Sequence, residues 1–410
     1  MCAIMGGAIA LPPLLGLRWP RLGATWVERS NSLRATGMEV GERLQVDVVR
    51  PEELQSPDLE RWDQLQAENA ELDSPFLSAR FAVAVGAVRR DTRIAVLSDD
   101  SGTMAFFPFE KGRRGRGMAL AKGLSDVQGA IAPATMDLDL AGTMRACGLR
   151  LFEFDHFLAA QEGWLTSLPS RFVLETSPAL DLSDGFDAYM SQKQTASKSL
   201  FQSTARKRRK LEREHGAIRL NFHEPDHRLL DHVLSWKSSQ YRRTGRRDRF
   251  ADAGNRALVH TLLDVPDATF GAPLTALYAG DSLVAAHLGL RSRHTLAWWF
   301  PVYDPAFAAY SPGLILCLDL ARAMAAERLS LLDLGKGDES YKDRLSNTSV
   351  RLLNGTVAHS RPKQASHTIR RWPAEQAMNM VLGSSRLRQL SRSALARAGG
   401  LRERLARSPE

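Results

Sequence analysis

Cysteine is scarce in this sequence, and long apolar runs are absent. Only three cysteines occur among 410 residues, Cys2, Cys147 and Cys317, and none belongs to a C-x-x-C pair or to a Cys/His cluster with metal-ligand spacing. No run of 18 or more apolar residues appears, which argues against a membrane-spanning helix. We therefore expect a soluble protein of the reducing cytoplasm that binds no metal.

Several familiar catalytic and nucleotide-binding signatures are missing as well. The sequence has no hydrolase nucleophile elbow, no P-loop and no dinucleotide-binding fingerprint at the required spacing. The glycine pair Gly335 and Gly337 is too short for any of these motifs. The corresponding classes of enzyme are therefore not expected.

The two ends of the chain differ from its body. Residues 1–17 are apolar but lack the positive segment of a secretory signal, and Pro12 and Pro13 interrupt them. We interpret residues 1–40 as a disordered leader or an over-extended translation start. Residues 361–410 carry eleven Lys or Arg against three Asp or Glu. This tail predicts either amphipathic helices that lie on an anionic membrane or a disordered basic segment.

The net charge of +9 is concentrated in two places, the tail and residues 193–213. The second stretch holds eight Lys or Arg against Glu212 alone, so the remaining body is mildly acidic. No aromatic residue interrupts the basic run 206–210, which argues against stacking on bases, and a nucleic-acid partner is not expected. Two interpretations of this run stay open: a solvated helix face, and a basic ridge that attracts a phosphorylated donor or a polysaccharide.

Apolar patterning predicts an α/β fold with two domains, residues 41–178 and 179–360. The first domain should contain a strand at 44–49, a helix at 58–71, a hairpin of 94–97 with 104–109, a helix at 157–162, and strands at 151–154 and 172–174. The second should begin with one long helix over 184–214, which Ser183 can cap and Gly216 can end.

The second domain has the more specific pattern. A strand at 218–222 and helices at 229–241 and 255–263 precede three strands at 274–278, 283–291 and 295–301. The three strands predict an antiparallel meander with a tight turn at Gly280-Asp281. An apolar helix at 314–327 then crosses over to a buried strand at 329–334.

Two motifs flank this crossover. Tyr310-Ser311-Pro312-Gly313 opens the apolar helix, and the run 333–342, DLGKGDESYK, follows the buried strand. Together they resemble the acyltransferase family linked to cellulose and exopolysaccharide biosynthesis, which is related to the Fem-type peptidyltransferases. The resemblance covers residues 187 to about 355. It implies tandem GNAT-like domains with mixed central sheets, and acetyl-CoA or another acyl-CoA as the donor.

The helix start at residues 310–313 is a natural seat for the donor's phosphates. A helix N-terminus presents unpaired N–H groups and the positive end of its dipole. Pro312 pre-sets the first turn, and Gly313 lets a phosphate approach the backbone. The loop lacks the several glycines and the basic residue of the usual GNAT signature, so a plain helix start is the alternative.

The charged corner at 333–342 is the predicted catalytic segment. Acylation of an amine needs a base for the ammonium proton and a proton donor for the leaving thiolate. We expect Glu339 or Asp333 to serve as the base, directly or through water, and Tyr341 as the donor to the thiolate. Lys342 either binds donor phosphate or neutralises Glu339. The structural alternative is that these charges pair and Tyr341 only packs.

His287 is a further catalytic candidate, because small neighbours on its strand face leave room above the sheet. In GNAT folds the strands at 295–301 and 329–334 would splay apart, and the donor's pantetheine arm would enter the gap. Trp298 and Trp299 point to opposite faces of the first of these strands, so one is expected in the core and the other beside the acceptor channel.

The sequence therefore predicts an acyl-CoA-dependent N-acyltransferase that acts on an amino sugar or polysaccharide precursor for the cell surface. A small-molecule or glycan acceptor follows, and polysaccharide-synthase machinery is the candidate protein partner. Two alternatives stay open: a Fem-like transferase that uses aminoacyl-tRNA, and a catalytically silent accessory subunit of a polysaccharide synthase.

Overall fold

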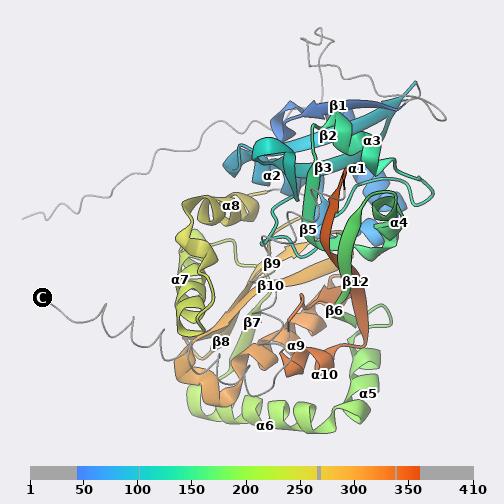
Figure 1. Ribbon diagram of the computed structural model, residues 1–410. Coiled ribbons are helices and arrows are strands. Elements are labelled where there is room, and N and C mark those ends of the chain that lie inside the picture. Colours follow the sequence, from blue (N-terminus) through green and yellow to red (C-terminus); the bar gives the residue numbers. More distant parts are fainter. Residues whose placement is uncertain (1–43, 101, 266–268, 338, 361–410) are drawn as a thin grey trace, which may run out of the picture.

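The computed structural model describes residues 44–100, 102–265, 269–337 and 339–360, which form a mixed α/β protein (Figure 1). The predicted leader and tail lie outside these residues. Within them, one twelve-stranded sheet has the order β1-β2-β3-β4-β5-β12-β6-β11-β10-β9-β8-β7. We call residues 44–169 the first half and residues 170–360 the second half. The predicted α/β fold class is confirmed.

In the first half, the sheet is built from five strands: β1 (Gln45–Val49), β2 (Thr92–Asp99), β3 (Gly102–Lys111), β4 (Arg116–Ala119) and β5 (Leu151–Leu158). The helices are α1 (Ser56–Glu68), α2 (Ala79–Val88), α3 (Leu140–Ala146) and α4 (Glu162–Thr166). The expected strand at 44–49, helix at 58–71 and hairpin after residue 94 are confirmed to within a few residues.

The last described strand joins the two halves into one sheet. β12 (Thr348–Ala358), the last described strand, lies between β5 and β6 (Ser170–Asp181) and is antiparallel to both. Gly355 allows this close pairing, because a Cβ there would lie 2.3 Å from the Arg171 carbonyl oxygen. The boundary predicted at residue 178 falls inside β6, and the division into two domains stays a prediction.

The second half has the predicted meander, helix and strand in the predicted order. The meander consists of β8 (Leu274–Ala279), β9 (Ser282–Arg291) and β10 (Thr295–Tyr303), and β7 (Ile218–Asn221) pairs with its outer edge. Gly280 makes the tight turn with a φ of +55°. The crossover helix is α9 (Pro312–Ala326), and it leads to β11 (Leu331–Asp333) and the short α10 (Ser340–Leu345).

Two helix predictions need correction. The expected helix at 184–214 is two helices, α5 (Phe186–Ala196) and α6 (Lys198–His215), because Ser197 leaves the helical conformation at φ −129°, ψ 35°. Gly185 rather than Ser183 precedes α5, whereas Gly216 ends α6 as expected. The helix expected at 157–162 exists but starts later: β5 runs to Leu158, a 3-10 turn covers Ala159–Gln161, and α4 follows. A bulge in β5 brings the rings of Phe154 and Phe157 into contact within the strand.

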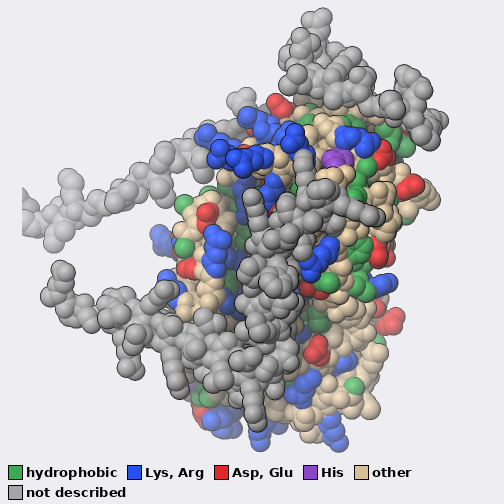
Figure 2. Space-filling model, viewed as in Figure 1, with side chains coloured by type: hydrophobic (Ala, Val, Ile, Leu, Met, Phe, Trp, Pro, Cys, Tyr) green, Lys and Arg blue, Asp and Glu red, His purple; other side chains and the backbone are tan. Residues whose placement is uncertain are grey.

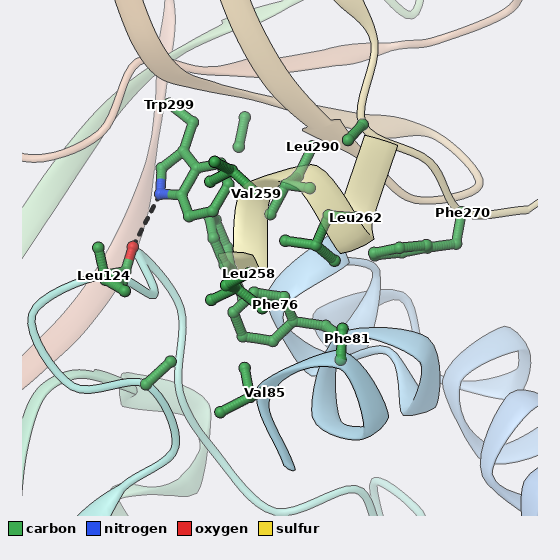
Figure 3. Close-up of a cluster of buried hydrophobic side chains, with 14 of the residues drawn as sticks. Phe76, Phe81, Val85, Leu124, Leu258, Val259, Leu262, Phe270, Leu290 and Trp299 are labelled. Atoms are coloured by element: carbon green, nitrogen blue, oxygen red, sulfur yellow. Dashed lines mark hydrogen bonds between the residues drawn. The ribbon is translucent and has the colours of Figure 1, made fainter. Parts of the chain in front are cut away.

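A shared core joins the halves (Figure 3). Phe76 and Phe81 beside and within α2 pack with Leu258 and Leu262 of α8 (Ala253–Leu263), and the Trp299 ring of β10 lies edge-on to Phe76. α7 (His227–Arg243) covers the same face of the sheet, while α5, α6 and α9 cover the opposite face. Among the residues described, no helix is both long and apolar enough to cross a membrane.

Candidate active site

The candidate active site begins where two parallel strands diverge. β10 pairs with β11 over Thr295–Leu331, Leu296–Leu332 and Ala297–Asp333, and β10 then continues to Tyr303 alongside β9. The register with β9 shifts between Ala297 and Phe300, so β10 bulges at Trp298 and Trp299. Beyond Ala297 and Asp333 the two strands are no longer paired with each other, and we call this end of their pairing the gap.

Asp333 closes the inner end of this gap. It is 3% exposed, and its Oδ1 accepts hydrogen bonds from the Ser177 hydroxyl and, at 2.9 Å, from the Gly335 N–H. Burial raises the pKa of the carboxyl group, and these two hydrogen bonds oppose that effect. Gly335 has a φ of +71°, so the carboxylate caps a turn that suits glycine.

Lys342 and Glu339 form the charged corner beside this turn. The Lys342 Nζ donates to the carbonyl oxygens of Gly335 at 3.0 Å and Lys336 at 3.1 Å, and it lies 3.3 Å from Glu339 Oε2. Glu339 Oε1 also lies 3.4 Å from Arg246. Burial favours the neutral carboxyl, but Lys342 and Arg246 prevail and lower the pKa of Glu339. The Glu339 side chain remains 37% exposed, so a ligand can reach it.

Tyr341 of α10 and His287 of β9 both lie beside the Trp298 indole. Burial raises the pKa of Tyr341 and the neighbouring Trp298 indole opposes this only in part, so the phenol stays protonated at neutral pH. The His287 ring stacks on Trp298 at 4.4 Å, and its Nε2 lies 3.2 Å from the Ala297 carbonyl oxygen. His287 is fully buried, which lowers its pKa to about 3 and keeps the imidazole neutral.

Lys237 is a residue of this site that sequence reasoning missed. Its Nζ donates a 2.9 Å hydrogen bond to the Pro301 carbonyl oxygen, on the part of β10 that lies beyond the pairing with β11. Lys237 is 9% exposed, and burial with the nearby Arg246 and Arg249 charges lowers its pKa to about 7. Its place on the apolar face of α7, with Leu234 and Tyr241 one helical turn away, was the available signal.

The predicted donor seat is where α6 meets the start of α9. Ser311 has a φ of +53°, and Lys207 Nζ donates a 2.7 Å hydrogen bond to its hydroxyl oxygen. Tyr310 donates to Glu214 Oε2 at 2.7 Å, and Lys210 Nζ lies 5.4 Å from the Tyr310 ring centroid. Lys and Arg side chains gather along the lower edge of Figure 2, over α6. The positive charge missing from the loop therefore comes from the basic run of α6.

A separate cleft of about 690 Å³ lies between the halves and reaches Asp333. Its walls carry both signs of charge, and they include Asp63, Asp73, Val127, Leu158, Arg293 and Arg351. The structure thus brings together Asp333, Glu339, Tyr341 and Lys342 at the gap. His287 lies beneath Trp298, and residues 310–313 form a second group at the start of α9.

Comparison with known proteins shows what the second half is similar to. Residues 198–343 match the family model described as the acetyltransferase (GNAT) domain. The C-terminal domain of a putative lysylphosphatidylglycerol synthetase from Agrobacterium fabrum is 12% identical with a TM-score of 0.51, over 77% of this chain and 95% of that chain. FemX is 6% identical with a TM-score of 0.53, over 77% of this chain and 98% of that chain. No curated protein matches the chain.

At these identities the solved structures support the fold, and the domain match supports the enzyme class. A tandem GNAT protein from the clavulanic acid biosynthesis pathway is also similar, at 9% identity and a TM-score of 0.45 over 78% of this chain and 99% of that chain. The resemblance to the cellulose and exopolysaccharide family stays a prediction. The chain is an acyltransferase with a GNAT-like fold, and its residues 198–343 match the GNAT domain model.

Proposed function

We propose that this protein is an acyl-CoA-dependent N-acyltransferase, with acetyl as the transferred group and an amino sugar or related polysaccharide precursor as the acceptor. The observation that carries the proposal is that Tyr341 and the Glu339–Lys342 pair lie together in the segment that follows β11, where β11 and β10 stop pairing. A thioester held in this gap would have a proton donor and a carboxylate within one site.

The donor's phosphates would bind at the start of α9. Lys207 and Lys210 place two ammonium groups beside Ser311 and Tyr310, and the helix dipole adds positive potential. Gly313 contributes space, since the nearest atom to a Cβ built there is Tyr303 Cδ1 at 3.9 Å. This arrangement fits a nucleotide pyrophosphate without a glycine-rich loop.

In the proposed reaction, one group accepts a proton from the acceptor and another donates a proton to the leaving thiolate. Glu339 binds the ammonium of the acceptor and takes one proton from it, directly or through water. The free amine attacks the thioester carbonyl carbon, so that a C–N bond forms and the C–S bond breaks. Tyr341 protonates the departing thiolate and regains a proton from the new amide nitrogen through water. One proton is released overall for each acyl group transferred.

Asp333 and His287 are proposed as positioning residues. Asp333 holds the Gly335 turn through its Oδ1, and this turn supplies a carbonyl oxygen to Lys342. His287 supports the Trp298 ring, which in turn contacts Tyr341. Both residues therefore control the geometry of groups that would touch the substrates.

Calorimetry with acetyl-CoA, followed by turnover with glucosamine as the probe acceptor, tests this proposal. We expect saturable acetyl-CoA binding, and we expect Tyr341→Phe and Glu339→Gln each to lower kcat by about 100-fold, the usual contribution of a positioned acid or base. Tyr278→Phe is the matched control, because that hydroxyl lies near Glu224 on β8, which β9 separates from β10. Unchanged turnover in both site variants would remove the site.

A second donor is aminoacyl-tRNA. The similarity to FemX in fold and the exposed basic side chains of α6 favour testing it, although similarity at this identity concerns the fold alone. A gel shift with charged tRNA that weakens steeply with salt would support this donor. Detecting acetyl transfer from acetyl-CoA to any amine would count against both this donor and a silent accessory role beside a polysaccharide synthase.

A further inference from the structure

A basic loop follows α7 and turns back toward the candidate site. We use this name for residues 242–249, which include five arginines. Arg242 and Arg243 belong to the last turn of α7, where the helix dipole favours cations, so they need no further explanation. The later arginines stand beyond the helix. Gly245, with a φ of +69°, reverses the chain there, and the Arg246 N–H donates to the Tyr241 carbonyl oxygen at 2.9 Å.

Two contacts fix the end of the basic loop between α7 and β10. The Ser238 hydroxyl of α7 donates to Asp248 Oδ1 at 3.1 Å. The buried Phe250 ring lies edge-on to Phe300 of β10, with 4.8 Å between the ring centroids. Phe300 precedes Pro301, whose carbonyl oxygen binds Lys237. The loop is therefore held against the part of β10 that lies beyond its pairing with β11.

Three cationic side chains meet at this place with little negative charge to balance them. Arg246 Nη2 lies 3.4 Å from Oε1 of Glu339, the proposed base, and Glu339 is shared with Lys342. Lys237 is buried, and its Nζ has only a carbonyl oxygen as hydrogen-bond partner. The Arg249 side chain is half-buried, and within the described part of the chain it has no ion pair and no hydrogen bond.

Gathering like charges in a partly buried place costs free energy unless an anion joins them. Burial, followed by the charges of Arg246 and Arg249, lowers the pKa of Lys237 to about 7, which is a sign of this repulsion. A phosphate would relieve it, because a dianion offsets more than one cation. The planar guanidinium of arginine also suits a phosphate, to which it can donate two parallel hydrogen bonds.

We propose that the acceptor is an amino sugar that carries a phosphate group, and that Arg246, Arg249 and Lys237 bind this phosphate while the acceptor ammonium meets Glu339. The proposal rests on the proposed function and names the chemical class of its acceptor. Arg246 links the two ends, since it contacts Glu339 and belongs to the basic loop. Without the phosphate, the ammonium would enter a site of like charge.

Equilibrium binding tests this acceptor class without any acyl transfer. Calorimetry compares glucosamine 6-phosphate with glucosamine as probes on the full chain. We expect the phosphate to bind about 100-fold more tightly, and Arg246→Gln and Arg249→Gln each to reduce this advantage about tenfold. Arg243→Gln is the matched control, because Arg243 lines a small hollow with Trp236 and Tyr303 and should keep the full advantage. No advantage in wild type, or equal losses in all three variants, would overturn the proposal.

The donor seat is the other place where a phosphate could bind. Lys207→Ala removes an ammonium group from that seat and should leave the advantage of glucosamine 6-phosphate unchanged. If Lys207→Ala abolishes the advantage and Arg249→Gln does not, the phosphate binds at the donor seat and the proposal is wrong.

Turnover with acetyl-CoA separates this inference from the proposed function. We expect kcat/KM for glucosamine 6-phosphate to exceed that for glucosamine by about the same 100-fold, and Arg249→Gln to narrow the ratio about tenfold. Acetyl transfer to both probes at equal kcat/KM would contradict the acceptor class alone. Loop-dependent binding without acetyl transfer to either probe would reject the proposed function, and with it the role of the loop in binding an acceptor.

Discussion

The indole N–H of Trp299 donates a 2.8 Å hydrogen bond to the carbonyl oxygen of Leu124, 175 residues earlier in the chain (Figure 3). It joins the bulged part of β10 to the segment that carries Asp126. The bond is buried, and the Trp299 ring also packs against Phe76. This side chain is therefore one of the buried contacts that hold the first half against the second.

Replacing Trp299 with Phe should lower the free energy of unfolding by about 1–3 kcal/mol, because the buried Leu124 carbonyl loses its donor and the smaller ring leaves space. Urea denaturation followed by circular dichroism measures the change. Trp236→Phe is the control, since that indole is only partly buried on α7 and should cost less. Equal costs for the two variants would contradict the anchoring role.

Lys237 should make stability depend on pH in the alkaline range. Its pKa is about 7 in the folded protein against 10.5 for an ordinary lysine, so between these values the unfolded chain binds more protons. Stability must then rise with pH in that window, by roughly 1.4 kcal/mol per pH unit at most. The unfolding free energy of wild type minus that of Lys237→Met should therefore rise from pH 7 to pH 10. A difference that is independent of pH would mean that Lys237 titrates normally.

Gln128→Leu should lower the unfolding free energy by about 2–4 kcal/mol, since the N–H groups of Asp155 and His156 lose their acceptor in a buried place. Chemical denaturation gives this value. Gln64→Leu, at an exposed position on α1 where the amide bonds only Glu68, should stay within about 0.5 kcal/mol of wild type. A small change in unfolding free energy for Gln128→Leu would show that the bulge of β5 does not need the Gln128 hydrogen bonds.

Lys207→Ala should weaken binding of the acyl donor and leave the rate of the chemical step nearly unchanged. Its ammonium group lies beside Ser311 at the start of α9, so the KM for acetyl-CoA should rise about tenfold while kcat changes little. Arg206→Ala is the comparison, because Arg206 is exposed on the same basic run. If both variants raise KM equally, the effect is long-range attraction and the seat at Ser311 is not specific.

Much of the second half was readable from the sequence. Short apolar runs marked β8, β9 and β10, Gly280 marked their first turn, and a longer apolar run marked α9. Local composition is enough for such elements because strands that are buried on both faces are apolar at nearly every position. The end of β5 was set too early, because its bulge at Asp155 and His156 interrupts the regular alternation of the strand.

The sequence revealed some residues of the candidate site and not others. The charged run from Asp333 to Lys342 was visible because so many polar groups follow one buried strand. Lys237 was not, since it stands on α7, far from that run. Only folding brings its ammonium group to the carbonyl oxygen of Pro301.

The sequence by itself therefore determined the elements, their order in the second half and the segment that carries Glu339 and Tyr341. Tertiary structure alone decided that β12 enters the first half's part of the sheet, that α6 meets the start of α9, and that Trp299 holds Leu124. The physical reason is that local patterns record which face of an element is buried. They do not record which distant element covers that face, because that choice depends on the shape of the whole core.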